Sequence, residues 1–313
     1  MDLQTSLAVL CPAVVFLYIV LVGTNTITMN KARLPLHKQC EQTYARIITG
    51  LRKIVVRILK QGPVPQHVAF IMDGNRRYAR KSHMAAAKGH VSGFYTLANV
   101  LKWCSELGIG NVSVFAFAIN NFNRSEEEVT ALMNLAKEKL RELVEKSDLV
   151  REHSVCIRII GNRGLLPADV LESVEFAEKE TEKNNGMVVN ICFAYSATDE
   201  ISSAVRKLIE DVENGRLQEE DIDEKCFESR LQIPGPDLDI LVRTSGQIRF
   251  SNFMLWQSSK MAYIQFVDAY WPDFSFTSML RIIVSWQMTV PKILQRKQTF
   301  AAANKKKKLT PTQ

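Results

Sequence analysis

Two short segments of the chain gather the residue types that bind phosphate groups and divalent cations. The first is Asp73-Gly74-Asn75-Arg76-Arg77, which directly follows the apolar run 68–72. A carboxylate is a hard oxygen ligand for Mg²⁺, and arginine side chains present fork-shaped donors to phosphate oxygens. The segment therefore predicts a diphosphate site. Composition alone leaves a second interpretation open, a turn with surface arginines.

A second polar segment, residues 243–252, also follows an apolar run. It carries two arginines and several small hydroxyl residues, among them Arg243, Arg249 and Ser251. A second anionic group could be held here, and two phosphate sites suggest a reaction between two phosphorylated molecules. The chain has no Gly-x-x-x-x-Gly-Lys-Ser/Thr loop and no Gly-x-Gly-x-x-Gly turn after an expected strand, so nucleotide hydrolysis and dinucleotide binding are not indicated.

The elements that must position these segments predict an α/β fold: a single domain with a six-stranded, mostly parallel sheet flanked by helices, over residues 62–296. Short apolar, β-branched runs alternate there with longer helical patterns. Because ligands bind outside the carboxyl ends of strands in such sheets, both segments should meet at one edge. The expected strands are 67–72, 112–118, 155–160, 188–193, 238–242 and 263–267, and the expected helices are 89–107, 126–146, 167–183, 198–214 and 276–294.

The N-terminal residues 1–30 are expected to form a membrane anchor. Residues 7–23 carry no charge, and 17 residues is the short end of a membrane-spanning helix. A cleaved signal peptide is the alternative, but the only charge before the run is Asp2. Lys31, Arg33 and Lys38 follow the run, which by the positive-inside rule places the following domain in the cytoplasm.

The remaining regions are basic. Residues 31–61 predict an amphipathic linker helix, and the lysine-rich residues 297–313 predict a disordered tail. The net charge of +7 is compatible with nucleic acid, an anionic membrane surface or phosphorylated substrates. No nucleic-acid partner is expected, because the notable arginines follow strands instead of lying on a helix face among aromatic residues. Contact with membrane lipid is the partner that the tail and the anchor suggest.

Several motifs in order then identify a resemblance to the cis-prenyltransferases, the undecaprenyl diphosphate synthase-like family. Residues 67–79 resemble the opening signature of that family, and eukaryotic dehydrodolichyl diphosphate synthase catalytic subunits are the closest in pattern. The likeness extends over about residues 62–296. Its further segments are 89–90, 117–124 with Glu128, 160–162, 190–195, 243–257 and 271–272.

The resemblance implies a role for each site residue. Asp73 would hold Mg²⁺, and Asp73, Asn75 and His90 would be the catalytic residues. The allylic diphosphate would be bound by Gly74, Asn75, Arg76, Arg77 and His90, and isopentenyl diphosphate by Arg243, Arg249 and Ser251. Phe122, Arg124 and Glu128 would support the site, although Ser125-x-x-Glu128 is also a helix-capping pattern that explains Glu128 structurally.

The implied function is the catalytic subunit of a Mg²⁺-dependent enzyme that condenses isopentenyl diphosphate onto farnesyl diphosphate, giving a long cis-polyprenyl diphosphate for dolichol or a related polyisoprenoid. The implied location is the endoplasmic reticulum membrane, with the catalytic domain in the cytoplasm. The C-terminal residues contain no Arg-x-Gly motif, so an accessory subunit is expected to supply it. A catalytically impaired scaffold subunit is the alternative, because Ala118 and Ala86 stand where the family pattern has serine and arginine. Gln247 is a further departure, in place of a common glutamate.

Eight apolar residues have two interpretations. The resemblance implies that they line or adjoin a tunnel for the growing chain, whereas their helical periodicity alone predicts ordinary core packing. They are Leu97, Val100, Leu101, Trp103, Leu132, Met133, Leu135 and Leu140.

Overall fold

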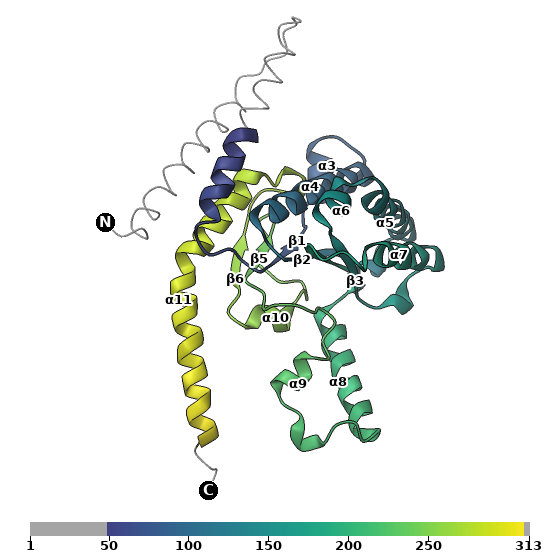
Figure 1. Cartoon of the computed structure of the whole chain (residues 1–313). Coiled ribbons are helices and arrows are strands. Elements are labelled where there is room, and N and C mark those ends of the chain that lie inside the picture. The colour runs from purple at the N-terminus through teal and green to yellow at the C-terminus, as the bar shows by residue number, and fades with distance from the viewer. Residues whose placement is uncertain (1–48, 310–313) are drawn as a thin grey trace, which may run out of the picture. The chain divides into compact units, whose positions relative to one another are not determined.

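The computed structural model describes residues 49–309, with the backbone alone for residue 149 and residues 296–309. Within this range the strands form one sheet in the order β3-β4-β2-β1-β5-β6, and every neighbouring pair is parallel (Figure 1). The strands are β1 (His67–Ile71), β2 (Asn111–Ala118), β3 (Cys156–Ile160), β4 (Val188–Tyr195), β5 (Ile240–Arg243) and β6 (Tyr263–Phe266). All six expected strands are therefore confirmed, with ends that differ by one or two residues.

The helices that connect these strands include the five that periodicity predicts. The long ones are α4 (Ala86–Leu107), α5 (Glu126–Lys146), α7 (Ala168–Thr181), α8 (Ala197–Glu213) and α11 (Phe276–Leu309). The shorter helices were not expected from the sequence: α3 (Asn75–Lys81), α6 (Asp148–His153), α9 (Glu224–Glu228) and α10 (Leu255–Ser259), with 3₁₀ turns at Ile119–Asn123, Arg163–Leu165, Glu219–Asp221 and Trp271–Asp273. Segments of five to seven residues are too short for a clear helical period.

The interior strands β1 and β4 are buried on both faces, as is typical of a parallel sheet, whereas β6 at the edge is half-buried. All five residues of β1 are buried, and β4 is buried from Val189 to Tyr195. Helices α5 and α7 lie side by side in Figure 1. Ser125 caps the start of α5, where its hydroxyl accepts a hydrogen bond from the N–H of Glu128 at 3.4 Å.

The strand order reverses between β1 and β5. From β1 the chain first adds β2 on one side, and later adds β5 on the other side. Such a switch point leaves a crevice at the carboxyl ends of the two strands, because their connections leave in opposite directions. Asp73 follows β1 and Arg243 ends β5, so both phosphate segments predicted from the sequence begin at this point.

The described residues divide into two compact units. One contains residues 65–105 and 109–274, which include the whole sheet, and the other contains residues 49–64, 106–108 and 275–309. In the second unit Arg52 pairs with Glu106 at 2.9 Å, and the amide of Gln287 donates to the carbonyl of Leu59 at 2.9 Å. The expected boundaries of the catalytic domain, 62–296, remain predictions.

Both ends of the described range, residues 49–59 and the end of α11, are helical. Residues 49–59 are helical, as part of the predicted linker helix 31–61. At the other end α11 continues to Leu309 instead of giving way to a disordered tail at residue 297. Alanine and lysine, which make up most of residues 301–308, are good helix formers, so the helix can extend without an apolar pattern.

None of the helices between residues 49 and 309 is long and apolar enough to cross a membrane. The predicted anchor, residues 1–30, lies outside the described range.

Candidate active site

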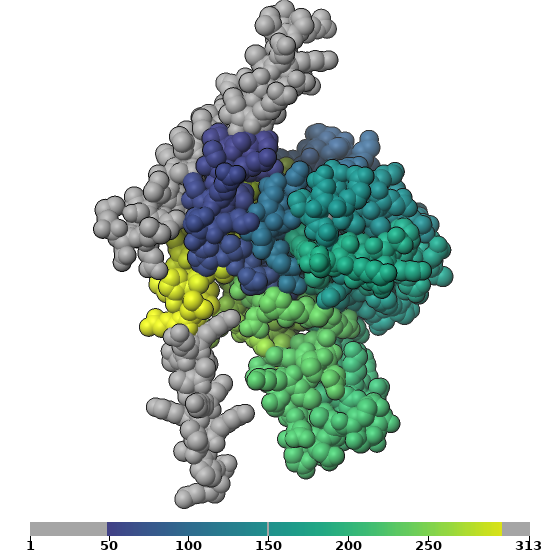
Figure 2. Space-filling model, in the orientation of Figure 1, coloured from purple at the N-terminus to yellow at the C-terminus, as the bar shows by residue number. Residues whose placement is uncertain are grey.

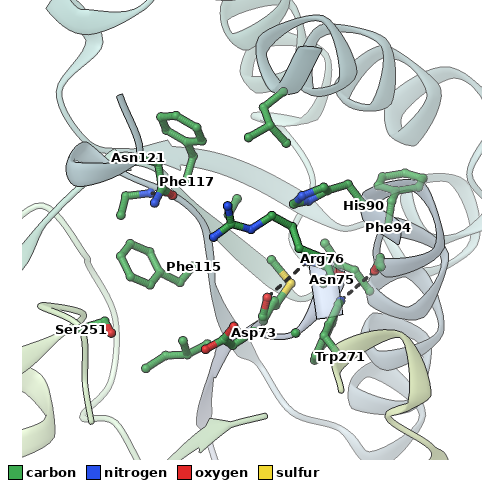
Figure 3. Close-up of a pocket in the computed structure, with 18 of the residues that line it drawn as sticks. Asp73, Asn75, Arg76, His90, Phe94, Phe115, Phe117, Asn121, Ser251 and Trp271 are labelled. Carbon is green, nitrogen blue, oxygen red and sulfur yellow. Dashed lines mark hydrogen bonds between the residues drawn. The ribbon is translucent and has the colours of Figure 1, made fainter. Parts of the chain in front are cut away.

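A cavity of about 780 Å³ opens at the carboxyl ends of β1, β2, β4 and β5. Asp73 after β1, Asn75 and Arg76 on α3, and His90 on α4 surround the same space in Figure 3, together with Phe115 and Phe117 of β2. The cavity contains the expected metal ligand Asp73 and all eight residues expected to bind the two diphosphates: Gly74, Asn75, Arg76, Arg77, His90, Arg243, Arg249 and Ser251. One half of its wall is charged and the other half is apolar.

Asp73 joins the two phosphate segments. Its carboxylate accepts hydrogen bonds from Arg77 at 3.3 Å and from Arg243 at 2.8 Å. Partial burial acts to raise the pKa of Asp73, but the hydrogen bond and charge of Arg243, with those of Arg77, outweigh it and hold the pKa below its usual value. The carboxylate is therefore ionised and fixed in place at the switch point.

The backbone at Gly74 brings two loops together. Gly74 has φ of 107°, and a Cβ at this position would meet Tyr270 at 2.9 Å and Ser245 at 3.1 Å. Asp73 is held on both sides, because its N–H donates to the hydroxyl of Thr244 at 3.0 Å and its carbonyl accepts from the N–H of Trp271 at 2.9 Å. Only glycine fits this close approach without strain.

Arg243 organises the second segment. Its side chain is 4% exposed, and its guanidinium donates to the hydroxyl of Ser251 at 2.7 Å, to the carbonyl of Arg249 and to Asp73. Its Nε is buried without a hydrogen-bond partner in the described structure. Arg249 is exposed and donates to Gln247 at 2.8 Å, so it remains accessible to an anion in the cavity.

Asn75 and Gly93 are in tight contact at the start of α3. The Asn75 amide nitrogen donates to the carbonyl of Met72 at 3.4 Å, while its Oδ1 is buried without a partner in the described structure. A Cβ on Gly93 would lie 2.3 Å from that Oδ1 and 3.0 Å from Trp271. Trp271 in turn donates its indole N–H to the carbonyl of Gly93 at 2.8 Å. A buried amide oxygen without a donor is uncommon in folded proteins, and here it accompanies the tight packing of Asn75 on Gly93.

His90 lies deeper in the cavity wall and is neutral near pH 7. Burial, and then the charge of Arg124, lower its pKa to about 4, against the opposing charge of Glu128. Its Nε2 is buried without a partner in the described structure. A neutral imidazole in this place can donate a hydrogen bond to a phosphate oxygen without adding charge to the site.

We expect the unusual pKa of His90 to make stability depend on pH. An unfolded chain binds a proton on this histidine below about pH 6.5, whereas the folded protein does so only near pH 4, so folding loses stability as the pH falls through that window. In urea unfolding at pH 7, 6, 5 and 4.5, His90→Gln should lose less stability on acidification than the wild type. His67, whose pKa burial also lowers, is present in both proteins, so the difference reports His90. An equal loss of stability on acidification in the two proteins would show that His90 does not cause this pH dependence.

The supporting residues form an ion-pair group at the mouth of the cavity. Glu128 pairs with Arg124 at 2.7 Å and with the exposed Arg76 at 3.4 Å. The N–H of Glu128 donates to the Ser125 side chain, which is one half of the predicted capping pattern, and the supporting role of Glu128 stays a prediction. Phe122 does not line the cavity but packs edge-on against Phe117, which does, with ring centroids 4.9 Å apart.

The apolar half of the cavity lies between α4, α5 and the sheet. Leu97, Leu132 and Leu135 line it, so these three fit the tunnel interpretation. The other five residues of that set, Val100, Leu101, Trp103, Met133 and Leu140, are buried and do not line the cavity, which fits core packing. Periodicity cannot separate the two groups, because both lie on the inward face of a helix.

Sequence reasoning missed several residues of the cavity. Lys139 lies among apolar neighbours, pairs with Glu142 at 2.5 Å and stands 5.4 Å from the centroid of Phe94. A lysine on the apolar face of a helical pattern was the available signal. Arg80 and Asn121 also line the cavity, and Asn121 accepts from the N–H of Ala118 at 3.0 Å.

The residues that depart from the family pattern have different surroundings. Ala118 and Gln247 line the cavity. Ala86 is the exposed first residue of α4 and is not part of the cavity wall. The alanine in place of arginine at residue 86 therefore lies farther from the cavity than the departures at residues 118 and 247.

Three comparisons with known proteins agree with this geometry. The family model "Putative undecaprenyl diphosphate synthase" matches residues 71–293. A dehydrodolichyl diphosphate synthase complex subunit of Homo sapiens is 41% identical over 258 residues, 82% of this chain and 77% of that protein. Its Schizosaccharomyces pombe counterpart is 43% identical over 239 residues, 76% of this chain and 90% of that protein. The crystal structure of lavandulyl diphosphate synthase from Lavandula x intermedia in complex with dimethylallyl diphosphate superimposes with a TM-score of 0.68 at 33% identity, covering 72% of this chain and 95% of that one.

Proposed function

The chain belongs to the undecaprenyl diphosphate synthase-like family of prenyltransferases, and on that basis we propose that it is the catalytic subunit of a cis-prenyltransferase. It condenses isopentenyl diphosphate onto an allylic diphosphate, with farnesyl diphosphate as the starter, and repeats the step to give a long cis-polyprenyl diphosphate for dolichol or a related polyisoprenoid. The related proteins named as dehydrodolichyl diphosphate synthase subunits support this product class.

One observation carries the proposal: two phosphate-binding segments, joined by the contact between Asp73 and Arg243, open on one cavity with an apolar half. Two diphosphates held side by side bring their carbon chains together. Leu97, Leu132 and Leu135 supply a dry wall for the growing hydrocarbon. A site for a single phosphorylated substrate needs only one of these segments.

In the proposed reaction the allylic C–O bond breaks, and its electron pair leaves with the diphosphate. The double bond of isopentenyl diphosphate forms the new C–C bond, and one proton is lost. Arg76 and Arg77 stabilise the charge that develops on the leaving diphosphate, and Asn75, which lines the same cavity, is the residue assigned to the departing proton.

The residues present fit Mg²⁺. Asp73 is an ionised carboxylate at the edge of the cavity, and Mg²⁺ is commonly bound by one or two carboxylates together with substrate phosphates. Between residues 49 and 309 no cluster of three or more His, Cys, Asp or Glu side chains could hold a metal alone, so the diphosphate itself would complete the coordination. When bound, the ion neutralises developing negative charge on the leaving group.

The enzyme is proposed to act with an accessory subunit at the endoplasmic reticulum membrane. The need for an accessory subunit is supported by the names of the two related proteins, which are subunits of a complex. The uncharged residues 7–23 support membrane attachment, with the catalytic domain in the cytoplasm. Flotation on lipid vesicles tests whether residues 1–30 attach the protein to a membrane, by comparing the full chain with a variant that lacks them. If both proteins float equally, these residues are not the anchor.

The function is tested by incorporation of labelled isopentenyl diphosphate with farnesyl or dimethylallyl diphosphate and Mg²⁺, with and without a candidate partner subunit. Polyprenyl product that depends on the partner supports the full proposal. Product from the purified chain alone, at full rate, overturns the heteromer. Absence of product in every combination favours the scaffold alternative, with Ala118 as the first residue to restore to serine.

We expect Gly93→Ala to impair this reaction although alanine favours helices. The new methyl group would overlap the Oδ1 of Asn75, so the amide must leave its place. We expect kcat to fall about 10- to 100-fold, a range typical for a small misplacement of a catalytic group. The matched control is Gly50→Ala, a helical glycine where nothing lies within 4 Å of the added carbon, which should leave kcat unchanged. Equal kcat values for the two variants would contradict the role of this contact.

A further inference from the structure

The loop that carries Ser251 has an unusual backbone. Ser245, Ser251, Asn252 and Met254 all have φ between 45° and 73°, the left-handed region that non-glycine residues rarely adopt. Such residues keep this conformation only where the surroundings hold them in place. The conformation matters for the site, because Ser251 accepts from Arg243 and the carbonyl of Arg249 does so too.

The first turn of α8 holds the loop at Asn252. The N–H of Ala197 donates to the carbonyl of Asn252 at 2.8 Å, and the N–H of Thr198 donates to its Oδ1 at 3.1 Å. The amide nitrogen of Asn252 donates back to the hydroxyl of Thr198 at 2.8 Å. Asn252 is thus held through its backbone and through both side-chain atoms, directly next to Ser251.

A second contact from the same turn holds the far end of the loop. Glu200 is buried and accepts from the hydroxyl of Tyr195 at 2.6 Å and from the amide of Gln257 at 3.2 Å. It also accepts from the N–H groups of Gln232 and Ile233 at 3.0 and 3.2 Å. Gln257 lies on α10, which begins directly after the loop. Four donors satisfy the buried carboxylate, so it fixes three segments of chain relative to one another.

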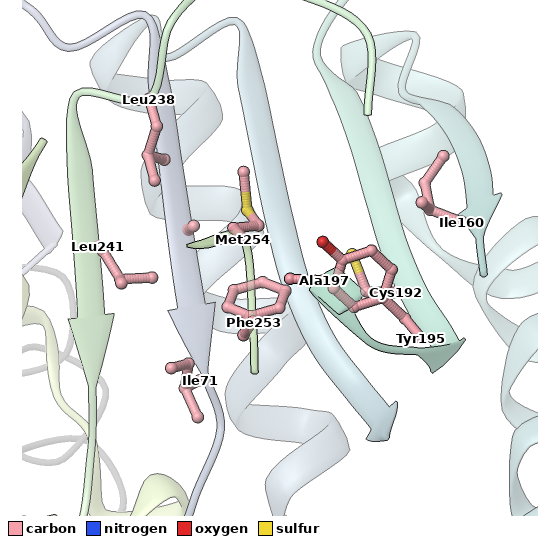
Figure 4. Packing of buried hydrophobic residues seen from close by; sticks show 10 residues of the cluster. Ile71, Ile160, Cys192, Tyr195, Ala197, Leu238, Leu241, Phe253 and Met254 are labelled. Atoms are coloured by element: carbon pink, nitrogen blue, oxygen red, sulfur yellow. The ribbon is translucent and has the colours of Figure 1, made fainter. Parts of the chain in front are cut away.

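Apolar packing also holds this loop in place. Phe253 is fully buried between these contacts, where its ring stacks on Phe115 at 4.6 Å and meets Tyr195 edge-on at 5.9 Å. Figure 4 shows Phe253 and Met254 facing Tyr195 and Cys192 within one cluster. Phe115 also lines the cavity, so the loop is packed against the cavity wall from behind.

We infer that Thr198 and Glu200 are positioning residues for isopentenyl diphosphate: through Asn252 and Gln257 they hold the loop in the conformation in which Ser251 meets Arg243. Neither residue lines the cavity. The inference rests on the proposed function and deepens it. It predicts that loosening α8 weakens the site on the β5 side, whereas the diphosphate site that follows β1 is unaffected.

The main test is Thr198→Val, which removes the hydroxyl and keeps the shape. Thr198 is exposed, so this variant is expected to fold. We expect the KM for isopentenyl diphosphate to rise about 10-fold, with the KM for the allylic substrate and Tm nearly unchanged; such a split marks a selective loss of binding. Thr198→Ser restores the hydroxyl and should restore the wild-type KM. Ser202→Ala, on the exposed surface of the same helix, is the matched control.

Two further measurements separate positioning from a purely structural role. If Thr198 acts through Asn252, then Asn252→Ala should raise the same KM, and the double variant should be no worse than the worse single one. In hydrogen exchange, residues 250–257 should exchange faster in Thr198→Val than in the wild type. An unchanged KM, an equal rise in both KM values, or a fall in Tm alone would overturn the inference.

Failure of the inference is distinguishable from failure of the proposed function. A wild type that makes polyprenyl product while Thr198→Val behaves identically refutes the positioning role alone. A wild type that makes no product refutes the function, and the hydrogen-exchange comparison then still decides whether Thr198 holds the loop. Glu200→Gln is a second variant, expected to show the same KM split with a larger loss of stability because the residue is buried.

Discussion

Asp73→Asn is expected to abolish most of the polyprenyl diphosphate synthesis, with kcat/KM lower by at least about 10³-fold, or about 4 kcal/mol of transition-state stabilisation. The carboxylate is ionised between Arg77 and Arg243 and is the metal ligand proposed here. The amide keeps the shape but loses the charge that Mg²⁺ needs. It also leaves Arg243, which is 4% exposed, without its anionic partner.

The measurement is initial-rate incorporation of labelled isopentenyl diphosphate, in parallel with thermal unfolding of the same samples. Asp239→Asn is the matched control: this carboxylate accepts from the N–H groups of Gln66 and His67, at the opposite end of β1. It should change Tm but leave kcat/KM within about 2-fold, an effect typical of sites remote from the chemistry. An Asp73→Asn protein that is folded and keeps a tenth of the activity would contradict the assignment.

Arg243→Lys should lower kcat/KM by about 10²- to 10³-fold, the loss typical when a preorganised donor is removed from an active site. The guanidinium reaches Asp73, Ser251 and the carbonyl of Arg249 at once, from a buried position. A lysine carries the same charge on a single nitrogen and cannot span these groups. We expect the larger part of the loss in the KM for isopentenyl diphosphate, with a lower Tm as well.

Arg249→Lys provides the graded comparison, because it is the same substitution six residues further along the chain at an exposed side chain. Arg249 contacts Gln247 and acts mainly as an accessible positive charge, which lysine retains. The kcat/KM of Arg249→Lys should fall only about 10-fold, because contacts of an exposed charged side chain contribute little and lysine keeps the charge. If the two variants lost activity equally, the fork-shaped contacts of Arg243 would not be the cause.

The sequence determined the α/β fold and the two polar segments at the cavity. Six apolar runs and five helical patterns predicted the parallel sheet, because alternation and period are local properties of the chain. The two polar segments could be named because they follow two of those strands, where ligands of such sheets bind. The role of each residue, and the choice of His90 on α4, came only from the family resemblance. Glu128 could be assigned to a helix cap from its spacing to Ser125.

Contacts between segments far apart in the sequence were decided only by the tertiary structure. The pairing of Asp73 with Arg243, 170 residues apart, exists because β1 and β5 are neighbours in the sheet. The hold of Thr198 on Asn252, the lowered pKa of His90 and the place of Lys139 in an apolar wall likewise depend on which segments the fold brings together. Hydrogen bonds, burial and charge depend on which groups lie within a few ångströms in the folded chain, and sequence spacing does not fix those distances.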